Sequence, residues 1–229
     1  MTTLALHYHP LSSYCHKVLI ALDELGIEAE KRLLNLGDPA ERSAFLALWP
    51  TGKMPLLMDQ GRPIPETSII IEHLQRHHAS PGRTLIPQEL DAALQVRLWD
   101  RLFDLYVMTP MQAFTTDLLR PEADRYALGV ANARERLQMS YALIDRHLEG
   151  RTWAAGETFS MADCAAAPAL FYAVTYMPMA PQHGHLISYF DHLMDRPSVA
   201  RTIDEARPWF KFYPGRNGLS RRFFDPESL

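Results

Sequence analysis

Serine and cysteine side chains lie three positions apart in the segment that begins with Ser12-Ser13 and ends at Cys15. An alternating apolar run, residues 4–8, precedes it and an amphipathic run, residues 18–22, follows it, which predicts a loop between a strand and a helix. N–H groups at a helix start stabilise negative charge, so this place suits a reactive oxygen or sulfur. Exchange through a paired dithiol is excluded, because the first position is serine. The structural alternatives are that Ser12 or Ser13 only caps the helix and that Cys15 is a small buried residue.

A second segment of interest, Lys53-Met54-Pro55, leads into a predicted strand. Proline is tolerated as the first residue of a strand, which is the simple interpretation. A cis bond before Pro55 would instead expose the backbone of the preceding residue as an edge for a peptide-like ligand. The sequence leaves both alternatives open.

A third segment, Glu66-Thr67-Ser68, precedes the apolar run 69–71 and predicts the start of a helix. An exposed hydroxyl and helix-start N–H groups beside Glu66 would suit a carboxylate ligand. Taken singly, the segment is better interpreted as a helix cap formed by Thr67 or Ser68.

Ser160 and Asp163 are spaced as in a capping box, with aspartate in place of the usual glutamate. We interpret this pair as structural, because it opens a strongly apolar run at helical spacing. The expected helix, 160–176, is interpreted as the buried centre of a helical domain.

The elements that must position these residues form two domains. Strand-like and helical runs alternate early in the chain and predict an α/β domain of order β-α-β-α-β-β-α. The predicted strands are 4–8, 32–36, 55–59 and 62–65, and the predicted helices are 13–25, 39–48 and 67–77.

The rest of the chain has the periodicity of an all-α domain. Its predicted helices include 133–148, 160–176, 186–195 and 198–205, and leucines at 94, 98, 102 and 105 have helical spacing. A Ser-Pro-Gly segment predicts a linker between the domains. The expected boundaries are 1–79 for the α/β domain, 80–90 for the linker and 91–229 for the helical domain.

Composition limits the classes of function. The 229 residues are 47% apolar and carry a net charge of −4, so no electrostatic footprint for nucleic acid is expected. Two cysteines far apart predict free thiols in a reducing compartment rather than a disulfide framework. The apolar stretch 164–181 is interrupted by Pro168 and Pro178 and predicts a core helix rather than a membrane span. The ten histidines are scattered without metal-ligand spacing, so no metal site is expected. No targeting segment is visible, and the protein is predicted to be cytoplasmic.

The order and spacing of the motifs is more specific than any one of them. Ser-x-x-Cys at the first strand–helix turn, Lys-Met-Pro before the third strand, Glu-Thr at the third helix and Phe-Ser-x-x-Asp in the helical domain occur in one chain. Over residues 3–205 the chain resembles the cytosolic glutathione S-transferase family, bacterial-type. The stretch "SSYCHKVLIAL" is similar to the serine-type first motif of the theta, tau and zeta classes.

The resemblance implies a thioredoxin-like domain that binds glutathione as co-substrate, followed by an all-α domain. By alignment, the Ser12 hydroxyl would hydrogen-bond the glutathione sulfur and favour its thiolate, with Ser13 as a substitute. Cys15 would matter only in an alternative, thiol reductase reading. The backbone of Met54, before a cis Pro55, would pair with the cysteinyl part of glutathione.

The resemblance also assigns the two ends of glutathione. Glu66 and Thr67 match the pair that receives the γ-glutamyl carboxylate and amine, with threonine where the family usually has serine. Lys53 is placed to meet the glycyl carboxylate or a backbone carbonyl. Trp49 departs from the asparagine that many members carry.

The electrophile and the assembly are the remaining expectations. A small apolar electrophile would bind between the domains, against Leu11, Tyr106, Met108 and Met111, although core packing is an equal alternative for the last three. The aromatic and basic tail, 208–222, would cover that cleft, pack on the second domain or contact a second subunit. A homodimer is expected, without nucleic acid or membrane as partner. The implied function is glutathione conjugation; isomerisation, peroxide reduction, thiol reduction or a non-catalytic binding role are the alternatives.

Overall fold

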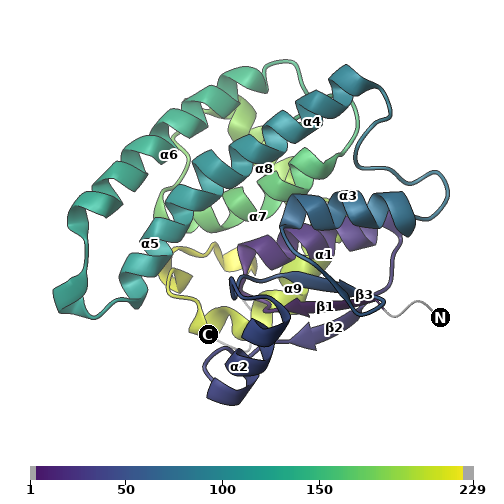
Figure 1. Cartoon of the computed structure of the whole chain (residues 1–229). Coiled ribbons are helices and arrows are strands. Elements are labelled where there is room, and N and C mark those ends of the chain that lie inside the picture. Colours follow the sequence, from purple (N-terminus) through teal and green to yellow (C-terminus); the bar gives the residue numbers. More distant parts are fainter. Residues whose placement is uncertain (1–3, 224–229) are drawn as a thin grey trace. The chain divides into compact units, whose positions relative to one another are not determined.

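The computed structural model of the protein describes residues 4–223 (Figure 1). Residues 1–3 and 224–229, the outer ends of the two expected domains, lie outside the described residues. The chain divides into two compact units, which meet in sequence between Ile86 and Pro87.

A four-stranded sheet forms the centre of the first unit. Its strands are β1 (Leu4–Tyr8), β2 (Glu30–Leu33), β3 (Leu56–Asp59) and β4 (Arg62–Ile64). Their order in the sheet is β2-β1-β3-β4; β1 is parallel to β2, and the β1–β3 and β3–β4 pairs are antiparallel.

The second strand is the one element of this unit whose position was predicted wrongly. It was expected at 32–36 because its leucines looked like an apolar strand, but β2 begins at Glu30 and all four of its residues are exposed. Leu34 and Leu36 lie beyond the strand, where they pack in an apolar cluster with Phe45 and Leu56. The apolar pattern of Leu34 and Leu36 therefore results from the packing of the loop after β2 and not from strand pairing.

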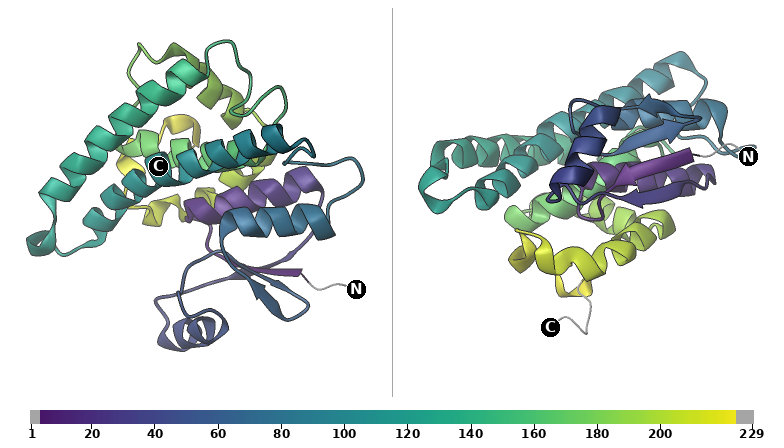
Figure 2. Two further views of the ribbon diagram at one scale, coloured as in Figure 1. Left: turned by 45° about the horizontal axis from the view of Figure 1, so that its top comes forward. Right: turned by 60° about the horizontal axis from the view of Figure 1, so that its bottom comes forward.

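Three helices complete the first unit, at the predicted positions. They are α1 (Ser13–Leu25), α2 (Pro39–Leu48) and α3 (Thr67–His77). α1 and α3 pack side by side, and Figure 2 shows them on one face of the sheet with α2 away from that face. Gly26 ends α1 at φ 66°, a conformation that glycine adopts without steric cost. The predicted order β-α-β-α-β-β-α and the thioredoxin-like fold are thus confirmed.

The second unit is helical, as predicted. Its α-helices are α4 (Leu90–Leu102), α5 (Thr109–Leu119), α6 (Ala127–His147), α7 (Met161–Tyr176), α8 (Gly184–Met194) and α9 (Pro197–Ala206). A π-helical segment, η1 (Phe103–Met108), joins α4 to α5 without a break. The short 3-10 turns are η2 (Glu122–Asp124), η3 (Arg207–Phe212), η4 (Arg216–Gly218) and η5 (Arg221–Phe223).

Helix α7 is the core of this unit, and it contacts α4, α5, α8 and η1. All residues from Met161 to Ala173 are buried, and no helix of the described chain is both long and apolar enough to cross a membrane. Ser160 and Asp163 form the capping box: Asp163 Oδ2 accepts from Ser160 N–H at 2.8 Å and from Ser160 Oγ at 2.9 Å. Its Oδ1 accepts from Tyr189 Oη at 2.6 Å and from Ala154 N–H at 2.9 Å. One carboxylate therefore ties the helix start to α8 and to the preceding loop.

The aromatic tail packs on the second unit, one of the three arrangements that the sequence left open. The ring of Phe210 lies 5.9 Å from that of Phe171, and Tyr213 lies 5.1 Å from Tyr172. At Gly218 a Cβ would come within 1.9 Å of the Thr175 carbonyl oxygen, so only glycine permits this approach.

Candidate functional site

Three of the predicted segments emerge from the same end of the sheet. Residue His7 of β1 pairs with Leu56 of β3, and Leu57 pairs with Ile64 of β4. The end of β1, the start of β3 and the end of β4 therefore lie at the same end of the sheet. Pro55 directly precedes β3, Glu66-Thr67 follows Pro65 after β4, and Ser12 lies in the loop after β1, so all three predicted segments lie at this end of the sheet.

Ser12 is the N-cap residue of α1 and is partly exposed. Its Oγ accepts a hydrogen bond from the Cys15 N–H at 3.3 Å. A hydroxyl has one donor hydrogen besides its acceptor lone pairs, so this cap leaves the O–H able to donate to a ligand atom. Ser13, in contrast, is buried in the first turn. The capping interpretation of Ser12 is therefore correct, and it is compatible with a second role.

Two histidines hold the loop that carries Ser12, and the sequence reasoning missed both. His16 Nε2 lies 2.6 Å from the Pro10 carbonyl oxygen, which only accepts, so Nε2 carries the hydrogen. The Ser12 N–H donates to the His9 carbonyl at 3.0 Å, and His9 Nδ1 accepts from the Leu11 N–H at 3.2 Å. Burial lowers the pKa of His9, consistent with an unprotonated Nδ1. Their position on either side of the Ser-x-x-Cys motif was the available signal.

Cys15 is fully buried on α1. Burial raises the pKa of its thiol to about 12, against smaller opposing effects of hydrogen bonds with Ser12 and the His9 backbone. A thiol with such a pKa is not a nucleophile near neutral pH. The structure thus favours the buried-residue interpretation of Cys15.

The Met54–Pro55 peptide bond is cis, the second of the two alternatives that the sequence left open. Pro55 is buried, Met54 is partly buried and Lys53 is exposed. Trp49, the departure from the family pattern, ends α2 and packs against the cluster of Leu34, Phe45 and Leu56.

The start of α3 differs from the capping interpretation. Neither Thr67 nor Ser68 caps the helix: both lie inside it, and Ser68 Oγ accepts from Lys17 Nζ at 3.1 Å. The N-cap residue is Glu66, whose side chain makes no cap hydrogen bond and whose φ is 67°. A non-glycine residue with positive φ is strained, and such strain is concentrated at functional sites. The helix N-terminus is therefore left without a side-chain cap and can accept an anion.

The residues expected to contact an electrophile are distributed over both units. Leu11 is partly exposed in the β1–α1 loop. In the second unit Tyr106 is 41% exposed, whereas Met108 and Met111 are buried. The structure therefore favours the packing alternative for the two methionines. Tyr106 lies in the π-helical segment, where its carbonyl accepts from Ser140 Oγ at 2.8 Å.

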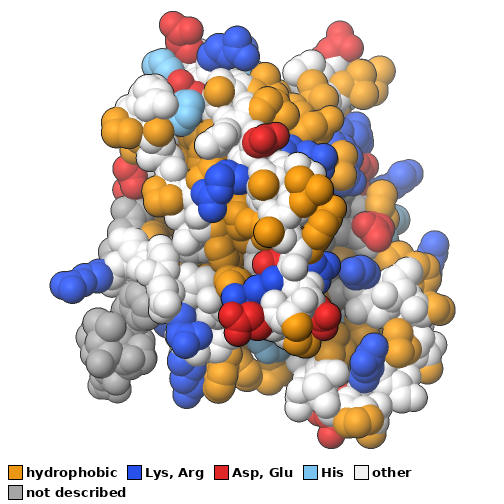
Figure 3. All heavy atoms as spheres, turned by 90° about the vertical axis from the view of Figure 1, so that its left-hand side faces the viewer, with side chains coloured by type: hydrophobic (Ala, Val, Ile, Leu, Met, Phe, Trp, Pro, Cys, Tyr) orange, Lys and Arg blue, Asp and Glu red, His pale blue; other side chains and the backbone are white. Residues whose placement is uncertain are grey.

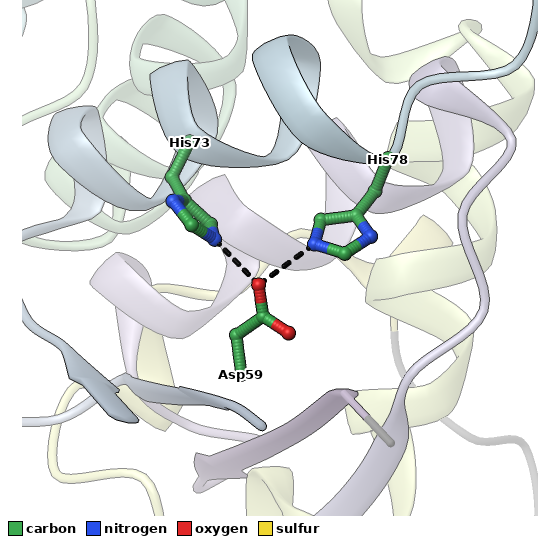
Figure 4. A group of neighbouring side chains, drawn as sticks. All are labelled: Asp59, His73 and His78. Atoms are coloured by element: carbon green, nitrogen blue, oxygen red, sulfur yellow. Dashed lines mark hydrogen bonds and ion pairs between the residues drawn. The ribbon is translucent and has the colours of Figure 1, made fainter. Parts of the chain in front are cut away.

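A second group of polar side chains lies at the opposite end of the sheet. There Asp59 ends β3, opposite Leu4 of β1, and contacts His73 and His78 of α3 and its C-cap (Figure 4). The sequence reasoning did not find this group, because its members are far apart in the chain. The signal present was the spacing of His73, His77 and His78 at the end of a predicted helix.

Models of protein families match both units. The glutathione S-transferase N-terminal domain matches residues 6–82, and the glutathione S-transferase C-terminal domain matches residues 123–211. Glutathione S-transferase A of Pleuronectes platessa is 25% identical over 194 residues, which are 81% of this chain and 84% of that protein. FtsZ-localized protein A of Caulobacter vibrioides is 33% identical over 175 residues, which are 71% of this chain and 73% of that protein.

A solved structure gives the same result. The crystal structure of a glutathione S-transferase from Methylobacillus flagellatus with GSH bound superposes with a TM-score of 0.79. It is 28% identical in sequence, and the similarity covers 87% of this chain and 98% of that one. Together with the two domain matches, this shows that the chain belongs to the cytosolic glutathione S-transferase family.

Proposed function

We propose that the protein is a cytoplasmic glutathione transferase that conjugates the thiolate of glutathione to a small apolar electrophile. The observation that carries this proposal is the start of α3, where the helix has no side-chain cap and Glu66 is held at a φ of 67°. An anion-accepting helix N-terminus beside a carboxylate suits an α-amino acid group, which has one negative and one positive charge. The γ-glutamyl end of glutathione is such a group.

The other parts of glutathione are assigned to residues at the same end of the sheet. Thr67 and the α3 N–H groups would hold the γ-glutamyl carboxylate, and Glu66 would hold the amine. The backbone of Met54, before cis Pro55, would pair with the cysteinyl residue. The exposed Lys53 would meet the glycyl carboxylate. The thiol would then reach the β1–α1 loop that Ser12 occupies.

Ser12 is proposed to stabilise the sulfur and not to attack the substrate. Its O–H would donate to the thiolate, and the N-terminus of α1 would add to the stabilisation of the negative charge. The thiolate then attacks the electrophilic carbon, a carbon–sulfur bond forms and the leaving group departs with the electron pair of its bond. The buried Cys15 takes no part in this proposal.

Single substitutions at the first motif test the proposal. With glutathione and 1-chloro-2,4-dinitrobenzene, Ser12→Ala should lower kcat/KM by about 100-fold, as loss of a donor to a developing anion does. It should also raise the pKa in the pH profile of kcat/KM, because the thiolate loses its donor. Ser13→Ala and Cys15→Ala are the controls, and both should retain most of the activity. Loss of activity in Cys15→Ala alone would contradict the role of Ser12.

For the electrophile we propose contact with Tyr106, while the buried Met108 and Met111 support the helical segment that carries Tyr106. Tyr106→Ala should raise the KM for the aryl halide and leave the KM for glutathione unchanged. An equal change in the KM for the aryl halide and the KM for glutathione would show that Tyr106 is not part of the electrophile site.

We further propose a homodimer. Four leucines of α4 and η1 are unusually exposed: Leu90 by 77%, Leu94 by 59%, Leu98 by 49% and Leu105 by 50%. The first three repeat at intervals of four and form an apolar stripe on the helix, which suits burial against a second copy. On the face in Figure 3, hydrophobic side chains are mixed with basic and acidic ones, so that face does not carry a single sign of charge.

A non-catalytic interaction role is the second candidate, and one comparison favours it. The relative of 33% identity is named for its localisation with FtsZ, not for a transferase activity. A thermal shift separates the candidates, since a ligand that binds only the folded state raises stability. Stabilisation by glutathione together with turnover of the aryl halide supports the transferase, whereas absence of both supports the interaction role.

A further inference from the structure

Three side chains converge at the end of the sheet that is opposite to the proposed glutathione site. Asp59 Oδ2 lies 2.8 Å from His73 Nε2 and 2.8 Å from His78 Nε2. Figure 4 shows both rings directed at the same carboxylate oxygen from α3 and its C-cap. All three potential ligand atoms lie within 4.8 Å of one another.

The group is sheltered but reachable. The exposed fractions of the side chains are 11% for Asp59, 18% for His73 and 13% for His78. Low exposure of this kind leaves the three side chains close to the surface, where an ion from solvent can reach them.

Hydrogen bonding alone does not account well for the arrangement of Asp59, His73 and His78. Both imidazoles approach the same oxygen, Oδ2, while Oδ1 is buried and has no hydrogen-bond partner among the described residues. A buried carboxylate oxygen without a hydrogen-bond partner costs free energy. Two histidine donors would satisfy the carboxylate better if each of them bonded a different oxygen. A single cation between the three side chains would bind both rings and the carboxylate at once.

We propose that Asp59, His73 and His78 bind one divalent transition-metal ion of the Zn²⁺, Co²⁺ or Ni²⁺ type. Two imidazole nitrogens and a carboxylate oxygen are a ligand set that such ions accept, at about 2.0–2.2 Å from Zn²⁺. The ion would bind Nε2 of each ring, and the hydrogen of each bound imidazole would lie on Nδ1. Water completes the coordination. This proposal replaces the expectation of no metal site, which rested on the scatter of the histidines along the chain.

His77 is not assigned as a ligand, although its ring centroid lies 4.6 Å from that of His73. It is exposed, and its nitrogens are not among the converging atoms. It therefore provides a matched control on the same helix.

The role of the ion would be structural. β3 runs from Leu56 to Asp59 and α3 from Thr67 to His77, so the ion would join the far ends of the two elements whose near ends carry Pro55 and Thr67. It would fix the third helix on the β3–β4 hairpin without contact with glutathione. The inference is thus independent of the proposed transferase activity.

Metal binding by the full chain, prepared without a histidine tag and stripped with a chelator, tests the proposal. Titration with Co²⁺ should give a visible d–d spectrum that saturates at one equivalent, and competition with a chromophoric chelator should give the Zn²⁺ affinity. Zn²⁺ should also raise Tm, because it binds the folded state. Absence of saturable binding by the unsubstituted protein would overturn the proposal.

Substitutions assign the ligands. Asp59→Asn, His73→Gln and His78→Gln should each weaken Zn²⁺ binding by at least about 100-fold, since even loss of a residue that supports a ligand costs 10–100-fold. His77→Gln and His185→Gln, on exposed histidines of the first and second units, should leave the affinity within about threefold. Equal loss in His77→Gln, or undiminished binding in the first three variants, would show that the ligand set is wrong.

One measurement does not depend on the folding of the variants. In the unsubstituted protein, Zn²⁺ should protect His73 and His78 from diethylpyrocarbonate, and it should not protect His185. Protection of all three, or of none, would overturn the assignment. Circular dichroism in excess chelator checks that each variant compared is folded.

Discussion

The hydroxyl of Ser12 is partly exposed at the start of α1, whereas the thiol of Cys15 is fully buried one turn further on. Ser12 is the N-cap residue and has an extended backbone just outside the helix, whereas Cys15 lies within the first turn of α1 and is buried. The thiol of Cys15, which is the more nucleophilic of the two groups, is thus buried away from any substrate. The reactive sulfur of the proposed mechanism belongs to glutathione.

Alkylation tests the state of the two free cysteines, Cys15 and Cys164, which are both buried. Because burial raises the pKa of Cys15 to about 12, its thiol is un-ionised at pH 8. We expect iodoacetamide to label neither cysteine in the folded protein and both after unfolding, as counted by mass spectrometry. Labelling of Cys15 in the native state within minutes would contradict this expectation.

His16 is expected to position Ser12 through the loop and not to touch glutathione. His16→Ala removes the donor to the Pro10 carbonyl and should lower the free energy of unfolding by about 2 kcal/mol, since a buried acceptor loses its partner. It should lower kcat/KM without a shift in the pH profile. His16→Gln, which can still donate, should recover part of both losses; a variant with normal stability and activity would leave His16 without the positioning role.

At the scale of elements, the start of α3 is expected to be less stable than it could be. Glu66 has a φ of 67°, and glycine there relieves the contact of Cβ with the backbone. Glu66→Gly should raise the free energy of unfolding by up to about 1 kcal/mol. It should nevertheless weaken glutathione binding by tenfold or more, because the carboxylate is lost.

The hairpin turn supplies the control for that prediction. Gln60 is exposed and has a φ of 51°, but it lies at the other end of β3 from Pro55. Gln60→Gly should give a comparable gain in stability, measured by urea unfolding, with unchanged glutathione affinity by calorimetry. If the affinity for glutathione were unchanged in Glu66→Gly as well, Glu66 would not be part of the binding site.

Helix α7 depends on one carboxylate. Asp163→Ala leaves the Ser160 N–H, the Ala154 N–H and the Tyr189 hydroxyl without their acceptor in a buried place. We expect a loss of about 3 kcal/mol or more in urea unfolding. Asp163→Asn retains one acceptor oxygen and should lose less; equal losses would mean that the charge of Asp163 matters more than its hydrogen bonds.

At the scale of the whole molecule, the leucine stripe of α4 predicts the assembly. Leu94→Glu with Leu98→Glu should convert a dimer to a monomer in sedimentation velocity, because two charges would be buried at the interface. Leu128→Glu, on an equally exposed leucine of α6, should leave the dimer intact. A monomeric unsubstituted protein, or dissociation by Leu128→Glu, would contradict the proposed interface.

Most elements were predictable because their signals are local. Helices α1, α2 and α3 begin and end at the predicted residues, since an N-cap serine, an N-terminal proline and a C-terminal glycine are read in the sequence itself. The exposed edge strand β2 was misplaced, because its apolar neighbours pack as a loop. Helix α6 begins at Ala127, six residues before its expected start, because its first turns are exposed and have little apolar pattern.

The chain alone determined the family resemblance, the two-domain order and the identity of the residues around the first motif, since these follow from residue type and spacing. Only the tertiary structure decided which of those residues are accessible: Ser12 partly, Ser13 and Cys15 not. It also decided the cis bond at Pro55, the strained Glu66 and the meeting of Asp59 with His73 and His78. Burial, backbone strain and the convergence of distant side chains depend on how elements pack, and packing brings together residues that no sequence interval relates.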